Sequence, residues 1–338
     1  MMTAHLSRRT ALTAALATLG LAATACTSDD PGGASASGTA SGGADLIPVT
    51  IGAVFTTAAV PFWVAQDQGI FAKNGLAATI TQAPNFAASA PSLLNGQMQF
   101  ANAATAPIIT AIAQDMPIQI VAGVQAEPKD TNEGDEGVMV PTDSPIKRPK
   151  DLQGKIVATS AIGSGPYVGV MANYLADGGA PDGINWVVIT LSEQIAALEK
   201  GQVDAIIASE PFTAAARKAG FISAFAAYRP DGLDVIPAGF PDAVLVASAA
   251  YLKDNHDTAA KMRQAMIEAN DYAQNNPDAV RKLLVDKLSM DPAIVQDVRL
   301  PAFIGEVTAA AVQPMVDAMA QIGLIDRELD ATSMVWMP

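Results

Sequence analysis

The strongest constraint on the fold is an alternation of short β-branched strands with helical segments, which runs through the chain and then restarts. Residues 47–54 (IPVTIGAV) and 76–82 predict strands, and a helix is expected between them over 61–72. The first series ends with a strand at 118–124, and a second series begins with one at 137–140. Strands that alternate with helices over short loops favour an α/β fold with a mainly parallel sheet.

The other expected elements continue this pattern through both series. They are helices at 87–95, 107–114, 166–177, 192–200, 253–275, 277–287 and 314–322, and strands at 100–102, 156–160, 186–190, 203–208 and 243–248. A weak repeat links the two series, because residues 93–100 and 198–205 each combine a helix end, a capping glycine and a strand. The repeat suggests two similar lobes, with a chance match as the alternative.

The N-terminal segment predicts an export signal over residues 1–25. Arg8 and Arg9 precede an apolar run at 11–25, which is too short to cross a hydrocarbon core of about 30 Å but fits a signal peptide. The adjacent arginines resemble a twin-arginine signal, and an ordinary signal is equally open.

The chain's single cysteine, Cys26, follows Ala-Thr-Ala at the end of this run. The arrangement resembles a bacterial lipobox, which implies cleavage before Cys26 and lipidation of its thiol. A plain signal peptidase site is the alternative. Residues 26–45 are then the lipidated cysteine and a Gly/Ser-rich flexible tether. We therefore expect an exported protein anchored to the outer face of the cell membrane.

Composition excludes several classes of function. A formal net charge of −14 leaves no basic stripe for nucleic acid. One cysteine allows no internal disulfide and no thiolate metal cluster, and of two histidines His5 falls in the predicted signal. His256 lies in a polar helix start, where a solvated side chain is expected. We therefore expect a binding protein rather than an enzyme, with no cofactor and no metal.

Four segments, in order, resemble one family. Residues 61–76 (PFWVAQDQGIFAKNGL) resemble its first helix and GxFxKxGL turn, and 94–100 (LNGQMQF) its LxxGxxDF strand, with Gln99 replacing the usual acid. Residues 144–157 resemble its DLKGKxV segment, and 197–212 its ALxxGxVDA…EPF segment. These are motifs of type II solute-binding proteins that serve ABC importers of nitrate, sulfonates, taurine and the pyrimidine precursor of thiamine.

The resemblance implies a two-lobed type II periplasmic-binding-protein fold with two crossovers and a ligand cleft between the lobes. Hinge closure over a small-molecule ligand would follow. We place the crossovers near 141–143 and 237–242, so that 46–141 and 242–338 form lobe 1 and 142–241 lobe 2, with the C-terminal helices returning to lobe 1. The implied partners are an ABC permease and its ATPase, and we expect a monomer.

Ligands of open α/β sheets lie beyond the carboxyl ends of strands, so loops supply the candidate ligand-binding residues. The candidates are Thr56, Thr57, Phe62, Trp63, Asn85, Phe86, Asn102, Thr105, Glu210, Phe212 and Asp242, with Gln125, Glu127 and Phe240 as weaker ones. Two alternatives stay open. Phe62 and Trp63 are equally compatible with the lobe core, and Glu210 with an ion pair to Arg217.

A glycine-rich turn at Gly163, Ser164 and Gly165 precedes a predicted helix. Free backbone N–H groups there favour an anion, whereas an ordinary turn with a capping serine is the alternative. We therefore rank a sulfonate-, taurine- or nitrate-like compound first and a thiamine-pyrimidine or other heterocyclic precursor second. A pyrimidine-synthesising enzyme is a minor alternative, because relatives of that kind use a histidine and a cysteine-rich motif.

Overall fold

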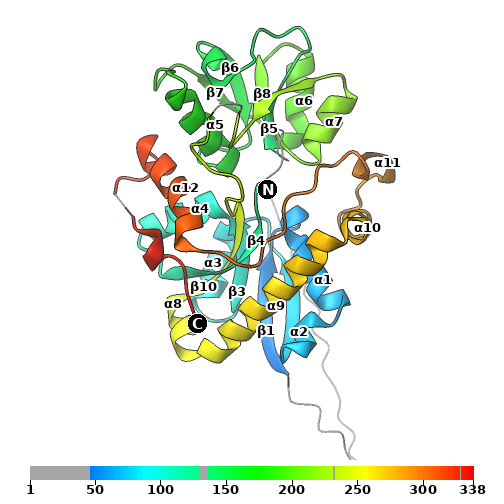
Figure 1. The fold of residues 1–338 in the computed structure, drawn as a ribbon, viewed down its shortest axis with the longest axis vertical. Helices are drawn as coiled ribbons and strands as arrows, with labels where there is room; N and C mark the ends of the chain where they lie inside the picture. Colours follow the sequence, from blue (N-terminus) through cyan, green and yellow to red (C-terminus); the bar gives the residue numbers. More distant parts are fainter. Residues whose placement is uncertain (1–45, 129–135, 231–232, 328) are drawn as a thin grey trace, which may run out of the picture. The chain divides into compact units, whose positions relative to one another are not determined.

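Two five-stranded sheets organise the computed structural model of this chain, which describes residues 46–128, 136–230, 233–327 and 329–338 (Figure 1). All of them belong to one compact unit, Ala44–Pro338. The predicted signal peptide, Cys26 and the tether lie outside the described residues. The first sheet has the order β2-β1-β3-β10-β4, and the second has the order β7-β6-β8-β5-β9.

The strand bounds of the first sheet are β1 Ile47–Ala53, β2 Leu76–Gln82, β3 Phe100–Ala104, β4 Ile118–Gln125 and β10 Ala243–Ser248. Those of the second sheet are β5 Glu136–Val140, β6 Ile156–Thr159, β7 Asn185–Val188, β8 Ala205–Ser209 and β9 Ile222–Ala226. The predicted strands at 76–82 and 243–248 are reproduced to the residue. β9 was not predicted, because its run ISAFA is short, although Gly220 with a φ of +93° marks the end of the preceding helix.

In each sheet, one strand is connected to the preceding strand of the chain by a crossover from the other sheet. β10 lies between β3 and β4 and is antiparallel to both, and β5 stands in the same relation to β8 and β9. The other pairings, such as β1 with β2 and β6 with β7, are parallel. Four of the five strands in each sheet thus run in the same direction, which agrees with the expectation of mainly parallel sheets, and the strand that crosses from the other sheet is the one that is reversed. The two crossovers themselves are confirmed.

The position of the first crossover differs from the prediction. Glu136 is opposite Ser209 and Gly137 is opposite Ala226, so residues 136–140 belong to the second sheet. The chain thus crosses between Gln125 and Glu136, which is before the predicted 141–143 and within the range 46–141 that was predicted for lobe 1. The second crossover falls between β9 and β10, in the region predicted. The remaining lobe boundaries are kept as a proposal.

Helices cover the sheets and form most of the C-terminal part of the chain. Their bounds are α1 Val60–Asp67, α2 Ile70–Lys73, α3 Phe86–Leu94, α4 Thr105–Ala113, α5 Gly165–Ala176, α6 Leu191–Glu199, α7 Phe212–Lys218, α8 Ala249–Asp254, α9 His256–Asn275, α10 Pro277–Leu288, α11 Pro292–Val295 and α12 Ala309–Gln321. Short 3-10 turns occur at Thr57–Ala59, Pro149–Leu152 and Ala331–Ser333. Within the described ranges, none of the helices combines the length and the apolar content of a membrane span.

Two predicted helices are each divided in the structure. The helix expected over 61–72 breaks into α1 and α2, because Gly69 adopts a φ of +67°, which right-handed helices exclude. The helix expected over 253–275 is α8 followed by α9, with Asn255 between them in a non-helical conformation. Conversely, Pro314 does not begin a helix but lies inside α12, which starts at Ala309.

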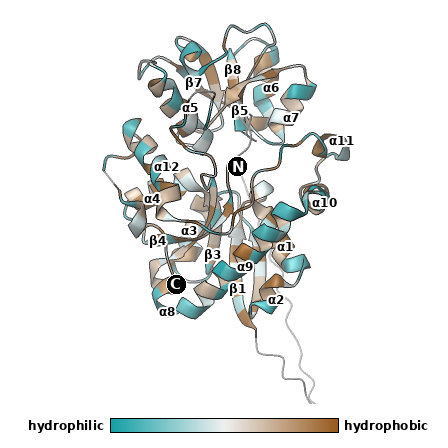
Figure 2. Cartoon of the chain, viewed as in Figure 1, coloured by the Kyte–Doolittle hydropathy of each residue, from teal (hydrophilic) through white to brown (hydrophobic). Residues whose placement is uncertain are grey.

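The C-terminal helices pack in two different ways. α9 lies on α1 and β4, as expected of a helix that returns to the first lobe, and buries Met262, Ala265 and Met266. The face of α9 turned to the viewer in Figure 2 is hydrophilic. α12 instead contacts both α4 and α5, and one apolar cluster joins Ile120 of the first sheet, Val138 of the second and Met315 of α12. The hydrophobic effect therefore holds the two sheets together through this cluster.

Helix α5 packs closely against the residues that follow β9. A Cβ at Gly169 would lie 2.7 Å from the carbonyl oxygen of Ala227, so only glycine allows this packing. Asn173, which is fully buried, donates from Nδ2 to the carbonyl oxygens of Tyr228 (2.7 Å) and Gly169 (2.8 Å). These hydrogen bonds fix the backbone at Tyr228.

We expect Asn173→Ala to lower the free energy of unfolding by about 1–3 kcal/mol, because it leaves buried carbonyl oxygens without a donor. The measurement is urea denaturation. Asn185→Ala is the matched control, since Asn185 makes the same kind of hydrogen bond, to Gly154, but is exposed. That control should change stability by less than about 0.5 kcal/mol. Equal effects of the two substitutions would contradict the assigned role.

Candidate ligand-binding site

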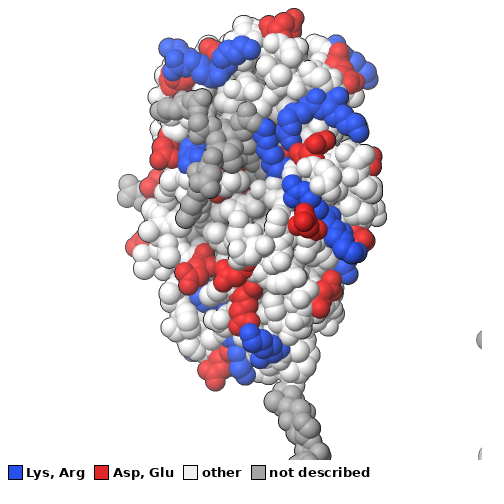
Figure 3. Space-filling model, turned by 45° about the vertical axis from the view of Figure 1, so that its right-hand side comes forward, with Lys and Arg blue, Asp and Glu red and all other residues white. Residues whose placement is uncertain are grey.

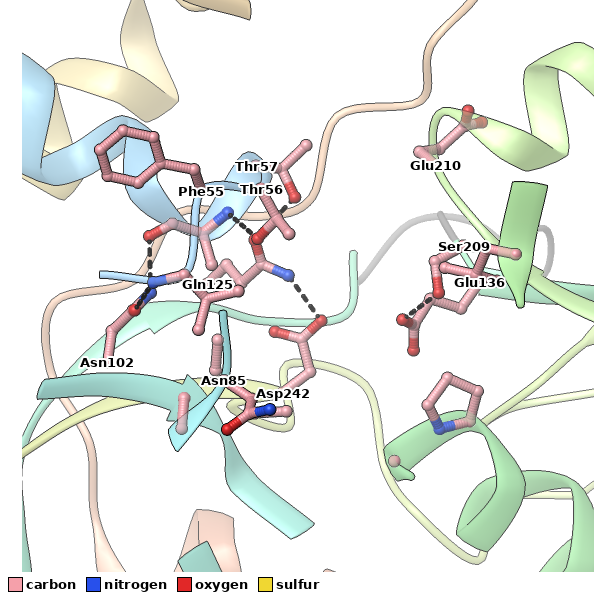
Figure 4. A pocket seen from close by; sticks show the side chains of 18 of the residues that line it. Phe55, Thr56, Thr57, Asn85, Asn102, Gln125, Glu136, Ser209, Glu210 and Asp242 are labelled. Atoms are coloured by element: carbon pink, nitrogen blue, oxygen red, sulfur yellow. Dashed lines mark hydrogen bonds between the residues drawn. The ribbon is translucent and has the colours of Figure 1, made fainter. Parts of the chain in front are cut away.

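A cavity of about 680 Å³ is lined by residues from both sheets and their loops (Figure 4). This volume lies within the range of about 300–1,000 Å³ that is usual for small-molecule sites. The lining comprises residues 54–58, 84–87, 102–104 and 209–212, with Pro107, Gln125, Glu136, Gly165, Pro166, Leu191, Tyr228, Asp242, Ala243, Leu288 and Met290. Most of these positions follow strand ends, as the rule for α/β sheets requires.

The structure brings most of the predicted site residues to this cavity. Those that line it are Thr56, Thr57, Asn85, Phe86, Asn102, Gly165, Glu210, Phe212 and Asp242. Those that do not line it are Phe62, Trp63, Thr105, Gly163 and Ser164. Of the weaker candidates, Gln125 lines the cavity, whereas Glu127 and Phe240 are buried outside the lining.

Two aromatic residues predicted to face the cleft lie behind the cavity instead. Phe62 and Trp63 are 0% and 3% exposed and belong to the apolar core, so their assignment to the cleft is wrong and the core alternative holds. The ring of Trp63 packs edge-on against Phe55, with centroids 5.2 Å apart. Phe55 itself lines the cavity. Trp63 therefore supports the aromatic wall from behind.

Asn102 and Thr105 hold backbone segments in place. Asn102 accepts from the N–H of Val54 at 2.7 Å and donates to the carbonyl oxygen of Ala58 at 3.3 Å, which fixes the loop after β1. Thr105 is fully buried, and its hydroxyl donates to the carbonyl oxygen of Pro241. Its backbone N–H donates to the carbonyl oxygen of Asp242 at 2.8 Å. Both residues position the site rather than offering free groups to a ligand.

The structure of the glycine-rich turn differs from the anion site that the sequence predicted. Ser164 is the N-cap of α5, and its Oγ accepts from the N–H of Tyr167 at 3.4 Å. Gly163 has a φ of +82°, as expected of a tight turn. Only Gly165 reaches the cavity, where a Cβ would lie 2.3 Å from the hydroxyl oxygen of Tyr228. The capped turn thus makes room for Tyr228, in agreement with the alternative interpretation.

Glu210 is already paired within the protein. Its carboxylate accepts from Arg217 Nη2 at 2.7 Å and from the backbone N–H groups of Ala214 (3.1 Å) and Arg299 (3.2 Å). The side chain is 1% exposed, and that of Arg217 is 26% exposed. This buried ion pair satisfies the carboxylate, so the alternative in which Glu210 pairs with Arg217 holds.

Two other carboxyl groups face the cavity from opposite sheets (Figure 4). Asp242, just before β10, accepts from Gln125 Nε2 at 2.9 Å, and Gln125 Oε1 in turn accepts from the Thr57 hydroxyl at 3.1 Å. Glu136, at the start of β5, accepts from the Ser209 hydroxyl at 2.6 Å. The second oxygen of each group, Asp242 Oδ1 and Glu136 Oε2, is buried with no hydrogen-bond partner among the described residues.

Burial and mutual repulsion favour the neutral forms of these groups. The pKa of Asp242 is raised to about 8, mainly by burial and further by the negative charge of Glu136. The hydrogen bond from Gln125 acts in the opposite direction and lowers this pKa. Burial also raises the pKa of Glu136, although the hydroxyls of Ser209 and Tyr228 oppose the shift. The pKa of Tyr228 is raised well above its usual value by burial and by the neighbouring carboxylates. Tyr228 therefore remains a hydrogen-bond donor at neutral pH.

The sequence prediction missed Glu136, Ser209 and Tyr228. The rule for α/β sheets selects the carboxyl ends of parallel strands, whereas Glu136 begins an antiparallel strand whose first residue lies opposite the last residue of β8. An acidic residue at the start of a crossover strand was the available signal. No lining residue in the described ranges is Lys, Arg or His. Nor does any group of three or more His, Cys, Asp or Glu residues there suit a metal ion.

Comparisons with known proteins agree with this architecture. The periplasmic aliphatic sulphonate binding protein SsuA from Escherichia coli matches with a TM-score of 0.70 and 20% identity, over 86% of this chain and 97% of that one. SsuA from Xanthomonas axonopodis pv. citri, bound to MOPS, gives 0.67 and 19% over 87% and 99%. The nitrate-binding protein NrtA from Synechocystis PCC 6803 gives 0.65 and 13% over 86% and 85%.

These similarities establish a type II periplasmic-binding-protein fold. A search of curated protein sequences finds no match. A family model described as NMT1/THI5 like matches residues 56–280, which is more than half of the 338 residues. The chain therefore belongs to the NMT1/THI5-like family.

Proposed function

We propose that this chain is the extracytoplasmic solute-binding component of an ABC importer, and that it is not an enzyme. The observation that carries the proposal is the cavity of about 680 Å³, whose wall is shared between two sheets joined by two crossovers. Support also comes from the relatives of this fold, whose names describe sulfonate- and nitrate-binding proteins. The partners would be a permease and its ATPase, and the working form a monomer.

Ligand capture would proceed by hinge closure. A solute that contacts Phe55 after β1 and Phe212 at the start of α7 touches elements of both sheets. Only the closed arrangement offers both contacts, so the solute shifts the population towards it. The closed form would then be the one that a permease recognises. Because such a ligand binds the folded protein alone, it also stabilises the fold by mass action.

Two ligand classes remain, and the cavity favours the one that the sequence ranked second. A small anion, such as a sulfonate, taurine or nitrate, needs cationic or free N–H groups, but Ser164 caps the turn predicted to supply them. A heterocyclic or aromatic compound instead suits the rings of Phe55, Phe86 and Phe212. We therefore propose a heterocyclic or aromatic solute ahead of an anionic one.

Nucleic acid is not a proposed partner. On the face shown in Figure 3, basic and acidic side chains alternate over the described residues rather than forming a basic stripe. The formal net charge of −14 acts in the same direction, because it repels phosphate groups.

We predict that an aromatic or heterocyclic solute raises the melting temperature of the purified chain in a thermal-shift screen that also contains taurine, ethanesulfonate and nitrate. For the best compound, Phe55→Ala and Phe212→Ala should each weaken binding by about 5- to 30-fold in calorimetry, because aromatic packing is lost. Ile162→Ala is the control, since Ile162 is 50% exposed and outside the lining. A screen without any stabilising compound would contradict the proposed function.

The proposed membrane anchor makes a separate prediction. Cells given radioactive fatty acid should label the natural chain and place it in the membrane fraction, because two acyl chains suffice for stable attachment. Cys26→Ala should abolish the label, whereas Ser28→Ala should keep it. Label on the Cys26→Ala chain, or a natural chain found only in the soluble fraction, would rule out a lipoprotein.

A further inference from the structure

Within the described ranges, the cavity contains two neighbouring acids without a cationic partner in the lining. Asp242 is 7% exposed, and its Oδ1 is buried without a hydrogen-bond partner among the described residues, as is Oε2 of Glu136. Figure 4 shows the two carboxyl groups directed towards the space between them, from Asp242 beside β10 and from Glu136 on β5. Buried carboxylates ordinarily pair with a cation or several donors. Here the side-chain donors are all neutral: Gln125 for Asp242, and the hydroxyls of Ser209 and Tyr228 for Glu136.

Among the described residues, the titratable groups that interact electrostatically with this pair are not cations. Glu127, after β4, and Tyr228, after β9, are an acid and a neutral hydroxyl that interact electrostatically within the same cluster. Arg217 is engaged by Glu210, and neither lysine nor histidine lines the cavity in the described ranges. A cation that enters would favour the ionised forms of the two acids and would be attracted to them, whereas an anion would find no cationic partner among the described lining residues.

The remaining wall suits the body of an organic cation. Phe55, Phe86 and Phe212 present aromatic rings. Leu288 at the end of α10 and Met290 just after it add aliphatic surface. Aromatic faces attract cations and also pack against flat or aliphatic groups. An apolar wall opposite two acids is thus complementary to a molecule with one charged end and one apolar end.

We propose that the site takes an organic cation, an amidinium or ammonium compound with an apolar body, whose N–H groups donate to both Glu136 and Asp242. This inference rests on the proposed function and adds the charge and donor pattern of the solute. Because one acid comes from each sheet, the cationic group would bridge the cleft. Two charge-assisted hydrogen bonds would form where two buried oxygens now have no partner.

The test is titration calorimetry on the full chain with cations and size-matched counterparts. Benzamidine and phenethylamine are the cations, benzoate and 3-phenylpropionate the anions, and benzamide the neutral control. We expect each cation to bind at least tenfold more tightly than its anionic counterpart, and benzamidine more tightly than benzamide. Anions that bind as well as the cations, or cations that do not bind, would overturn the inference.

Substitutions separate recognition of charge from folding. Asp242→Asn and Glu136→Gln keep the shape of the side chains and should each weaken benzamidine binding by tenfold or more. The Glu199→Gln control, exposed on α6, should leave binding unchanged. Melting curves of all variants identify any loss of fold. A folded Asp242→Asn or Glu136→Gln protein that binds benzamidine with unchanged affinity would contradict the proposal.

The pH dependence provides an independent measurement. With a pKa of about 8, Asp242 is largely protonated at pH 7, and a bound cation favours its ionised form. Benzamidine binding should therefore release a proton at pH 7, seen as a heat that differs between phosphate and Tris buffers. Affinity should rise from pH 6 to pH 9, by at most about tenfold per pH unit, and Asp242→Asn should remove most of that rise. An affinity that does not change with pH would contradict the bridge.

The two proposals fail in different ways. Binding of aromatic acids or neutral heterocycles without binding of cations would leave the solute-binding function standing and reject this inference alone. If neither the cations, the anions, the neutral control nor the compounds of the thermal-shift screen bind, both proposals are rejected.

Discussion

The candidate site depends on the insertion of one antiparallel strand into each sheet. Because β10 and β5 run against their neighbours, their first residues meet the last residues of β3 and β8: Ala243 is opposite Ala104, and Glu136 is opposite Ser209. In a parallel strand the starting residue would lie at the far edge, roughly 13 Å away for a five-residue strand at about 3.3 Å per residue. The reversal caused by the two crossovers therefore places both unpaired carboxyl groups at the cavity.

The residues behind the cavity explain how these groups are held. Trp63 backs Phe55, and Gly165 leaves the space that the hydroxyl of Tyr228 occupies. Asn173 fixes the backbone of Tyr228 through a hydrogen bond of 2.7 Å, and Gln125 orients Asp242. Each wall residue thus has a supporting partner whose own position is set by close packing. A site built in this way pays little reorganisation on binding, which is how rigid scaffolds achieve selectivity.

Local sequence signals predicted the parts of this structure that depend on local interactions. The strand at 76–82 was found to the residue because a β-branched run lies between turn signals. Nine of the predicted site residues line the cavity, and most of them lie just after parallel strands. Strand direction was not predictable in this way, because it follows from long-range connection, and Glu136 was missed as a result. The orientation of α1, which buries Trp63 behind Phe55, is likewise a property of packing. Glu210 had two compatible partners in the sequence, and only the fold selects Arg217.

The fold and the chemistry of the cavity give different information about the ligand. Structural relatives at 20% identity or less share the fold, and they include proteins named as sulfonate-binding and nitrate-binding. The fold determines where the loops meet, but a few side chains at the strand ends determine the charge of the ligand site. In this chain the turn at Gly163 is capped by Ser164, and the two crossover strands contribute Glu136 and Asp242. With the turn capped and no cation among the described lining residues, the proposed organic cation would supply the N–H donors that the two buried oxygens lack there.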